Sequence, residues 1–359
     1  MSDRLAAVFL RNSTVENRVV FMLRKHWTNV TSSALLLTCI AIFADTAVAQ
    51  KSVWEKGAVL QLVSEKGAGE GPAWNPAVGL VSSFGSVYLH DVENPQRGEP
   101  QIYIKDLGTN GLLWDAQGRL LCCQPSKQRV IRIEKDGSQT VLTDKYNDAP
   151  YNQPNDITVD NKGRIFFSDP KYGPYENLPQ KDFDGNPVEG VYMIDTDGYV
   201  TIQLMHDVDR PNGVLVSKDQ KHIWVAGNNN NNEGGERKLF RFELMSCCGG
   251  ILADTKEMIF DWEDGRGPDG MVQDSKGNVY VAGGLNKDDA AHETNRFKGG
   301  IYVFNSKGKY IDFIAVPKDE VTNCTFGGED MKTLFVTAGG SLYSIRTKNK
   351  GWLPVTDRK

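Results

Sequence analysis

A short pattern recurs six times along the sequence. Each copy begins with an acidic or amide residue, usually followed by glycine, and continues through a short apolar segment, a turn and a second apolar segment. We call the first residues of the copies the anchors, and they are Glu70, Asn110, Asn155, Asn212, Asp269 and Asn323. A third apolar segment that ends in a polar turn follows each copy, for example Val191–Ile194. The chain therefore consists of repeated units, and this repeat limits the folds that it can adopt.

The repeated units predict β-strands. Apolar residues alternate within the segments and turn-forming residues bound them, whereas no part of the chain after residue 50 shows a convincing helical period. Units of roughly 40–60 residues with about four strands each are typical of propeller blades. We predict an all-β fold, a six-bladed β-propeller of four-stranded antiparallel blades, over residues 50–359. Residues 53–63 are expected to supply the outer strand of the last blade and so to close the ring.

The first 49 residues are predicted to be a secretory signal peptide. A basic stretch follows Met22, an uncharged apolar run extends from Ala34 to Ala44, and small residues at positions 47 and 49 precede Gln50. The apolar run is shorter than the about 20 residues that span a bilayer. We therefore expect a periplasmic or secreted protein with no integral membrane span in the mature chain, and Met22 is an alternative start of translation. A buried N-terminal helix and a membrane anchor are the alternative interpretations of this segment.

Composition narrows the class of partner. The 359 residues carry a formal net charge of −5 and no long basic run, so nucleic acid is not an expected partner. The six cysteines show neither zinc-ligand spacing nor a readable disulfide framework. Cys122 and Cys123 are expected to be packed thiols that point to opposite faces of one strand.

The six anchors predict a single site. Equivalent positions of successive blades surround the central channel of a propeller, so the anchors would lie around one mouth of that channel. Their carboxylate and amide oxygens are the hard ligands that Ca²⁺ and Mg²⁺ prefer, whereas zinc prefers histidine and cysteine. Asn-Gly and Asp-Gly are also common turn formers, and this alternative explains Asn110, Asn212 and Asp269. It explains Glu70 and Asn155-Asp156 poorly.

Four anchors stand in short motifs, which are Glu70-Gly71-Pro72, Pro154-Asn155-Asp156, Arg210-Pro211-Asn212-Gly213 and Gly267-Pro268-Asp269-Gly270. These motifs resemble the signatures of the regucalcin, gluconolactonase and luciferin-regenerating enzyme family, and the resemblance covers about residues 57–348. Two further segments, Ser168–Gly173 and Thr322–Gly328, look like the bacterial gluconolactonase branch of that family. The resemblance implies a six-bladed propeller that holds one divalent cation at the channel mouth. Our prediction for this cation is Ca²⁺, with Mg²⁺, Mn²⁺ and Zn²⁺ as alternatives.

Carried over position by position, the resemblance assigns roles to the anchors. It implies that the metal ligands are Glu70, Asn155, Asn212 and Asp269. Asp269 would also be the catalytic acid and base, and we expect Asn110 and Asn323 to bind substrate hydroxyls. One position departs from the family, because regucalcin-type members have an arginine that helps to hold the sugar lactone where this chain has Gln153.

These assignments predict a lactonase, a hydrolase that acts on the ester bond of a small lactone. A sugar lactone such as gluconolactone is the expected substrate and the expected small-molecule partner. Two alternatives stay open from the sequence: an esterase or phosphotriesterase on the same scaffold, and a non-catalytic ligand-binding propeller with structural calcium.

Overall fold

The computed structural model describes residues 52–354, apart from 95–98, 173–177, 183, 197–200, 206, 246 and 288–290. The predicted signal segment lies outside these residues. The chain from Ala49 to Lys359 is one compact unit. Its described residues contain no α-helix and a single 3₁₀ turn, η1 (Pro125–Lys127), so no helix among them could cross a membrane.

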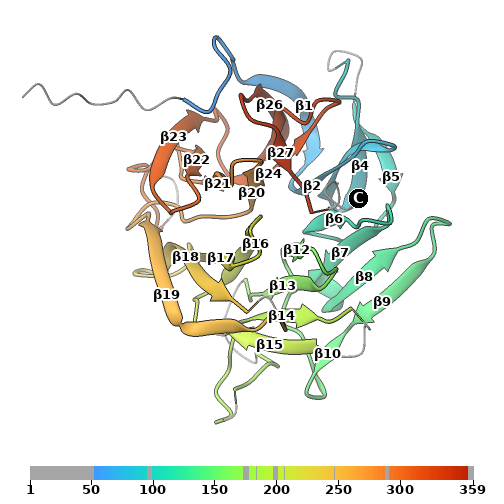
Figure 1. Ribbon diagram of the computed structural model, residues 1–359, viewed down its shortest axis with the longest axis vertical. Coiled ribbons are helices and arrows are strands. Elements are labelled where there is room, and N and C mark those ends of the chain that lie inside the picture. Colours follow the sequence, from blue (N-terminus) through green and yellow to red (C-terminus); the bar gives the residue numbers. More distant parts are fainter. Residues whose placement is uncertain are drawn as a thin grey trace, which may run out of the picture. The chain divides into compact units, whose positions relative to one another are not determined.

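Six antiparallel sheets follow one another around a ring, and each sheet is one blade (Figure 1). Blade 1 contains β2 (Glu70–Asn75), β3 (Gly79–Phe84), β4 (Ser86–His90) and β5 (Gln101–Ile104). Blade 2 contains β6 (Leu112–Trp114), β7 (Leu120–Gln124), β8 (Arg129–Ile133) and β9 (Gln139–Thr143). Blade 3 contains β12 (Ile157–Val159), β13 (Ile165–Asp169), β14 (Gly190–Ile194) and β15 (Thr201–Met205).

The second half of the ring repeats this arrangement. Blade 4 contains β16 (Pro211–Val216), β17 (His222–Asn228), β18 (Arg237–Leu244) and β19 (Ile251–Asp261). Blade 5 contains β20 (Met271–Asp274), β21 (Val279–Gly283), β22 (Gly300–Phe304) and β23 (Tyr310–Ala315). Blade 6 contains β24 (Val321–Gly327), β25 (Thr333–Ala338) and β26 (Gly340–Arg346), and a small hairpin of β10 (Lys145–Tyr146) and β11 (Ala149–Pro150) follows blade 2. The predicted six-bladed β-propeller is confirmed.

The fourth strand of blade 6 comes from the other end of the chain. Strand β1 (Gln61–Ala68) pairs antiparallel with β26, and its register joins Gln61 to Ser344 and Ala68 to Gly340. In Figure 1 the first strand accordingly lies beside one of the last. The ring is closed as expected, but the expected bounds 53–63 are wrong. Val59 is 70% exposed, and Trp54 forms only an isolated bridge to Thr347.

A short C-terminal strand adds to blade 5. Strand β27 (Gly351–Trp352) pairs with β20 and makes this sheet five-stranded. Trp352 and the following Leu353 are buried. Gly351 fits here because a Cβ at that position would lie 2.1 Å from Phe326 of blade 6. This strand was not predicted from the sequence.

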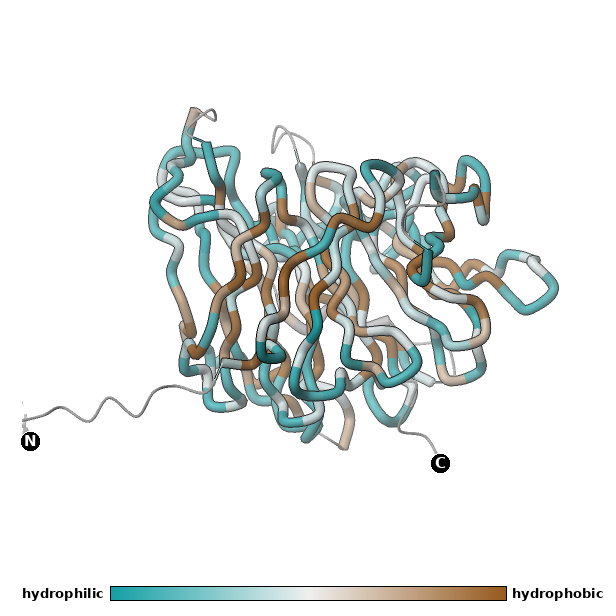
Figure 2. Tube along the Cα trace, turned by 90° about the horizontal axis from the view of Figure 1, so that it is seen from above, coloured by the Kyte–Doolittle hydropathy of each residue, from teal (hydrophilic) through white to brown (hydrophobic). Residues whose placement is uncertain are grey.

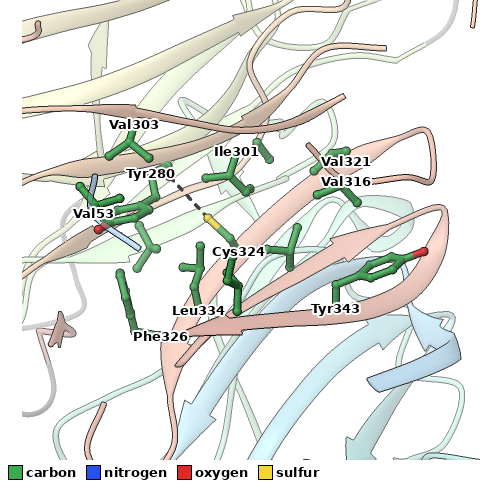
Figure 3. Packing of buried hydrophobic residues seen from close by; sticks show 14 of the residues in the cluster. Val53, Tyr280, Ile301, Val303, Val316, Val321, Cys324, Phe326, Leu334 and Tyr343 are labelled. Atoms are coloured by element: carbon green, nitrogen blue, oxygen red, sulfur yellow. Dashed lines mark hydrogen bonds between the residues drawn. The ribbon is translucent and has the colours of Figure 1, made fainter. Parts of the chain in front are cut away.

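The hydrophobic core is divided among the six interfaces between neighbouring blades. Six clusters of buried apolar residues exist in the described chain, and each draws its members from two adjacent blades. Figure 3 shows the cluster between blades 5 and 6, where the Cys324 thiol contacts the Tyr280 carbonyl. Cys122 belongs to the cluster toward blade 1 and Cys123 to the cluster toward blade 3, as the alternation of side chains along a strand requires. Figure 2 shows hydrophilic residues concentrated in the loops at both ends of the blades.

Aspartates at equivalent turns end the first strand of several blades. Asp160 Oδ1 accepts hydrogen bonds from the backbone N–H groups of Lys162 and Arg164, at 2.9 and 3.0 Å. Asp115 and Asp274 bond the residues two and four positions later in the same way. These side-chain bonds satisfy turn donors that strand pairing leaves open, so the aspartates fix where the hairpins reverse.

Candidate active site

The anchors occupy equivalent places at the start of the first strand of each blade. Glu70 begins β2, whereas Asn110 and Asp269 lie two residues before β6 and β20. The backbone N–H of Asn110 donates to the Cys123 carbonyl, and that of Asp269 to the Ala282 carbonyl, both at 2.9 Å. In these two blades, a backbone hydrogen bond with the second strand thus fixes the position of the anchor at the start of the first strand.

Close contacts between neighbouring blades draw the anchors together. A Cβ on Gly71 would lie 2.3 Å from the Asn110 carbonyl oxygen, and one on Gly111 would lie 2.6 Å from that of Asn155. On the opposite half of the ring, a Cβ on Gly213 would lie 2.2 Å from the Asp269 carbonyl oxygen. Contacts below 3.0 Å are not tolerated, so the glycine after an anchor lets the next anchor approach.

The turn-former interpretation of these glycines does not hold. Among Gly71, Gly111, Gly213 and Gly270, only Gly71 has a positive φ, of 53°. The other three adopt backbone angles open to any residue. They are needed for space, since a Cβ on Gly270 would lie 2.0 Å from the Asn323 side chain.

The two remaining junctions of the ring are made by side chains. Asn323 Nδ2 donates to Glu70 Oε2 at 3.2 Å and so joins blade 6 to blade 1. The Val214 N–H donates to Asp156 Oδ2 at 3.2 Å and joins blade 4 to blade 3. Asn323, from the opposite half of the ring, also lowers the pKa of Asp156 against the rise that burial causes, so the Asp156 side chain lies near the channel mouth.

Three carboxyl groups influence one another in this mouth. Burial raises the pKa of Glu70 well above its usual value, and the charges of Asp269 and Asp156 raise it further. Burial also raises the pKa of Asp156 to about 6. The pKa of Asp269 rises to about 7 by burial, although the nearby Arg266 guanidinium opposes the rise. The mouth is therefore a buried, acidic environment in which the ionised forms are costly.

Two buried oxygens in this region have no hydrogen-bond partner among the described residues. They are Oδ1 of Asp269 and Oδ1 of Asn110. A buried polar atom without a partner costs free energy unless a ligand, ion or water satisfies it. Both atoms belong to anchors, and Asp269 is 4% exposed. The two unpartnered oxygens indicate that a ligand, ion or water binds at the channel mouth.

The donor chemistry fits a divalent cation. Carboxylate and amide oxygens are hard ligands, and a cation among these carboxylates would offset the cost of their charge. Within the described ranges, no three His, Cys, Asp or Glu side chains are grouped closely enough to hold a metal ion by themselves. The predicted ligand set contains two carboxylates and two asparagine amides, so it does not require three such side chains. The Asn212 side chain lowers the pKa of Asp269, and the charge of Asp269 raises that of Glu70, so these three anchors lie near one another.

Asp156 and Tyr172 are site residues that we did not single out from the sequence. Asp156 stands where four repeat copies have glycine, and this exception to the pattern was the available signal. The Tyr172 hydroxyl accepts a hydrogen bond from Asn212 Nδ2 at 2.6 Å, although this tyrosine lies far from every anchor in sequence. Gln153, the position that departs from the family pattern, accepts the Tyr172 N–H at 2.7 Å. Its side chain thus holds the loop that carries Tyr172.

Known proteins resemble this chain over most of its length. The family described as SMP-30/gluconolactonase/LRE-like region matches residues 68–340. A gluconolactonase of Zymomonas mobilis subsp. mobilis is 25% identical over 316 residues, which cover 86% of this chain and 81% of that protein. A pentonolactonase of Haloferax volcanii is 26% identical over 283 residues, covering 76% and 81%. The solved structure of a gluconolactonase from Xanthomonas campestris superposes with a TM-score of 0.66 at 25% identity, covering 84% of this chain and 93% of that one.

Proposed function

The chain belongs to the SMP-30/gluconolactonase/LRE-like family, and from this premise we propose that it is a metal-dependent lactonase that hydrolyses a sugar lactone such as gluconolactone. The relatives named as gluconolactonase and pentonolactonase support lactone hydrolysis. The observation that carries the proposal is the buried Asp269 carboxylate, whose Oδ1 has no protein partner and which lies within the electrostatic influence of Glu70 and Asp156.

The proposed cation is Ca²⁺, held by oxygens of Glu70, Asn155, Asn212 and Asp269. A divalent cation bound there supplies Lewis-acid polarisation of the lactone carbonyl. Two of the four residues are carboxylates, so their charge of −2 matches that of the ion, and four side chains leave room among the 6–8 ligands that Ca²⁺ accepts. An incomplete protein shell suits a site that must also admit substrate.

Asp269 is the proposed proton carrier. Its carboxylate takes a proton from the attacking water as the new C–O bond forms at the carbonyl carbon. It returns that proton to the ring oxygen as the ester C–O bond breaks, and the product is a hydroxy acid. Asn110, whose buried Oδ1 lacks a partner, accepts a substrate hydroxyl in this scheme. Asn323 already donates to Glu70 through Nδ2 and accepts the Cys324 N–H through Oδ1. Its proposed contact with substrate uses the second Nδ2 hydrogen or the second lone pair of Oδ1.

The decisive experiment combines Asp269→Asn with removal of divalent ions. Asp269→Asn should lower kcat for gluconolactone by about 10²- to 10⁴-fold, because the amide cannot take up a proton, with unchanged thermal unfolding. Asp254→Asn, on an exposed part of β19, is the matched control and should keep full activity. EDTA should abolish acid release and Ca²⁺ should restore it. Full activity in EDTA, or activity on a phosphotriester and none on lactones, would contradict the proposal.

The proposed place of action is the periplasm or the cell exterior. This proposal depends on the order of charge, apolar run and small residues before Gln50. N-terminal sequencing of the protein from its native host should return Gln50 as the first residue. A mature protein that still begins upstream of the apolar run would count against export by this route.

A further inference from the structure

A chain of hydrogen bonds connects two proposed metal ligands, Asn212 and Asp269, through residues outside the anchor ring. Asn212 Nδ2 donates to the Tyr172 hydroxyl at 2.6 Å, and that hydroxyl donates to Asn228 Oδ1 at 3.0 Å. Asn228 Nδ2 in turn donates to the carbonyl of Pro268, the residue before Asp269, at 2.7 Å. The path therefore runs from one ligand side chain to the backbone that carries the other.

Backbone groups fix the direction of every bond in this path. An N–H group can only donate, and the Gly267 N–H donates to Asn230 Oδ1 at 2.8 Å. Asn230 must then use its nitrogen toward Asn228, and Nδ2 of Asn230 does donate to Asn228 Oδ1 at 3.0 Å. The Pro268 carbonyl can only accept, which also requires the nitrogen of Asn228 on its side. Both constraints leave Asn228 Oδ1 as an acceptor.

Because Asn228 Oδ1 is an acceptor, the Tyr172 hydroxyl determines the orientation of the Asn212 amide. A phenolic hydroxyl has one hydrogen, and Tyr172 gives it to Asn228. Its oxygen can therefore only accept from Asn212, which turns the nitrogen of that amide toward Tyr172. The amide oxygen of Asn212 must then face away from Tyr172. An asparagine amide has two ends of similar shape, so such a partner decides which end meets a ligand.

Tyr172 is itself held on three sides. Its backbone N–H donates to Gln153 Oε1 at 2.7 Å, and the Arg210 guanidinium lies 5.7 Å from the centre of its ring. Glu189 accepts the N–H groups of Lys171 and Arg210, at 2.5 and 2.9 Å, and so ties the tyrosine loop to blade 4. A side chain fixed in this way can impose an orientation on its neighbour.

We propose that Tyr172 is a positioning residue that turns the Asn212 amide so that its oxygen, and not its nitrogen, is presented to the cation. The inference rests on the proposed metal-dependent function and deepens it. The buried asparagines Asn228 and Asn230 support Tyr172, and they couple the orientation of Asn212 to the backbone immediately before Asp269. Neither asparagine contacts the substrate in this role.

The test is Ca²⁺ binding by titration calorimetry to protein stripped with EDTA. Tyr172→Phe removes only the hydroxyl and should raise the Kd for Ca²⁺ by about 10- to 100-fold, the usual effect of losing a group that orients a metal ligand. The matched control is Tyr302→Phe, because the Tyr302 hydroxyl also donates a hydrogen bond, to the Lys298 carbonyl at 2.7 Å, but lies in blade 5 away from the anchors. Its Kd should equal that of the wild type.

A double-mutant cycle separates orientation from general damage. Asp at position 212 offers two equivalent oxygens and needs no orientation, so adding Tyr172→Phe to Asn212→Asp should change the Kd by less than about threefold. An unchanged Kd in the single variant Tyr172→Phe would show that Tyr172 is not needed to orient Asn212, and would overturn the inference while leaving the proposed function intact. Equal losses in both backgrounds would also overturn it. A wild type that hydrolyses lactone yet binds none of Ca²⁺, Mg²⁺, Mn²⁺ and Zn²⁺ would remove the metal from the proposed function and this inference with it.

Discussion

His90 is a buried histidine whose hydrogen bonds define its protonation state. Its Nε2 lies 2.7 Å from Ser82 Oγ, and that hydroxyl donates to the Gly67 carbonyl at 2.8 Å. The serine hydrogen is thus committed, so Nε2 carries the ring proton and Nδ1 stays bare and buried without a partner. Burial lowers the pKa of His90 to about 4. The histidine is a neutral structural group of blade 1.

This environment predicts a pH-dependent loss of stability. The unfolded chain takes up a proton on His90 near pH 6.5 and the folded chain near pH 4, so the free energy of unfolding falls as pH falls through this window. The full effect is about 3 kcal/mol. Urea denaturation of wild type and His90→Gln at pH 7 and pH 4 should show this extra loss in the wild type only. Equal losses in the two proteins would contradict the assignment.

Some residues of the channel mouth could be predicted from the sequence, and others could not. The anchors were visible because the repeat places one acidic or amide residue at each equivalent position. Asp156 was visible in the Pro154-Asn155-Asp156 motif and as an exception to glycine, and Tyr172 within the segment Ser168–Gly173, but neither signal assigned the side chain a role. The contact of Tyr172 with Asn212 joins residues 40 positions apart, and side-chain direction within a loop has no period that a sequence pattern could show.

At the level of the strand, Gly213 in β16 illustrates why the blades meet so tightly. A Cβ there would lie 2.2 Å from the carbonyl oxygen of Asp269. That oxygen belongs to the backbone, so it cannot move aside as the end of a flexible side chain would. The first strands of blades 4 and 5 can lie this close only without a side chain at Gly213.

Gly213→Ala should therefore be severely destabilising. We expect a loss of more than about 3 kcal/mol in the free energy of unfolding, because a backbone shift must relieve the contact. Gly137→Ala is the control, since Gly137 has a φ of 84° and nothing within 4 Å of an added Cβ. It should lose only the about 1–2 kcal/mol of a left-handed alanine. Urea denaturation measures both, and similar losses would show that the contact at Gly213 is unimportant.

The strands of the blades could be predicted, but not all of their bounds. Alternating apolar residues and aspartate turns mark strands such as β13 and β21 directly. The closing strand was expected to begin at residue 53, whereas β1 begins at Gln61, because Val53, Val59 and Leu60 looked more apolar than the segment that pairs. Pairing with β26 chooses the register through backbone hydrogen bonds, and outer strands are too exposed for hydrophobicity to mark them.

On the scale of the whole molecule, the ring depends on its closing strand. Removal of residues 1–68 deletes β1 and leaves the open edge of β26 exposed to other chains. This truncation should lower the Tm and give aggregates in size-exclusion chromatography. Removal of residues 1–51 keeps β1 and should leave the Tm unchanged. A monomeric, equally stable protein without β1 would show that blade 6 needs only three strands.

The pairing of β1 with β26 also determines when folding can be completed relative to synthesis of the chain. Glu65 and Ser341, which this pairing brings into hydrogen-bond contact, are 276 positions apart. A ribosome releases the first partner early and the second only after five blades have been synthesised. Until β26 is synthesised, the apolar residues of β1 stay exposed. Contacts between residues so distant in sequence also form slowly. Completion of the propeller is therefore a post-translational step, and newly made chains should depend on chaperone protection until it occurs.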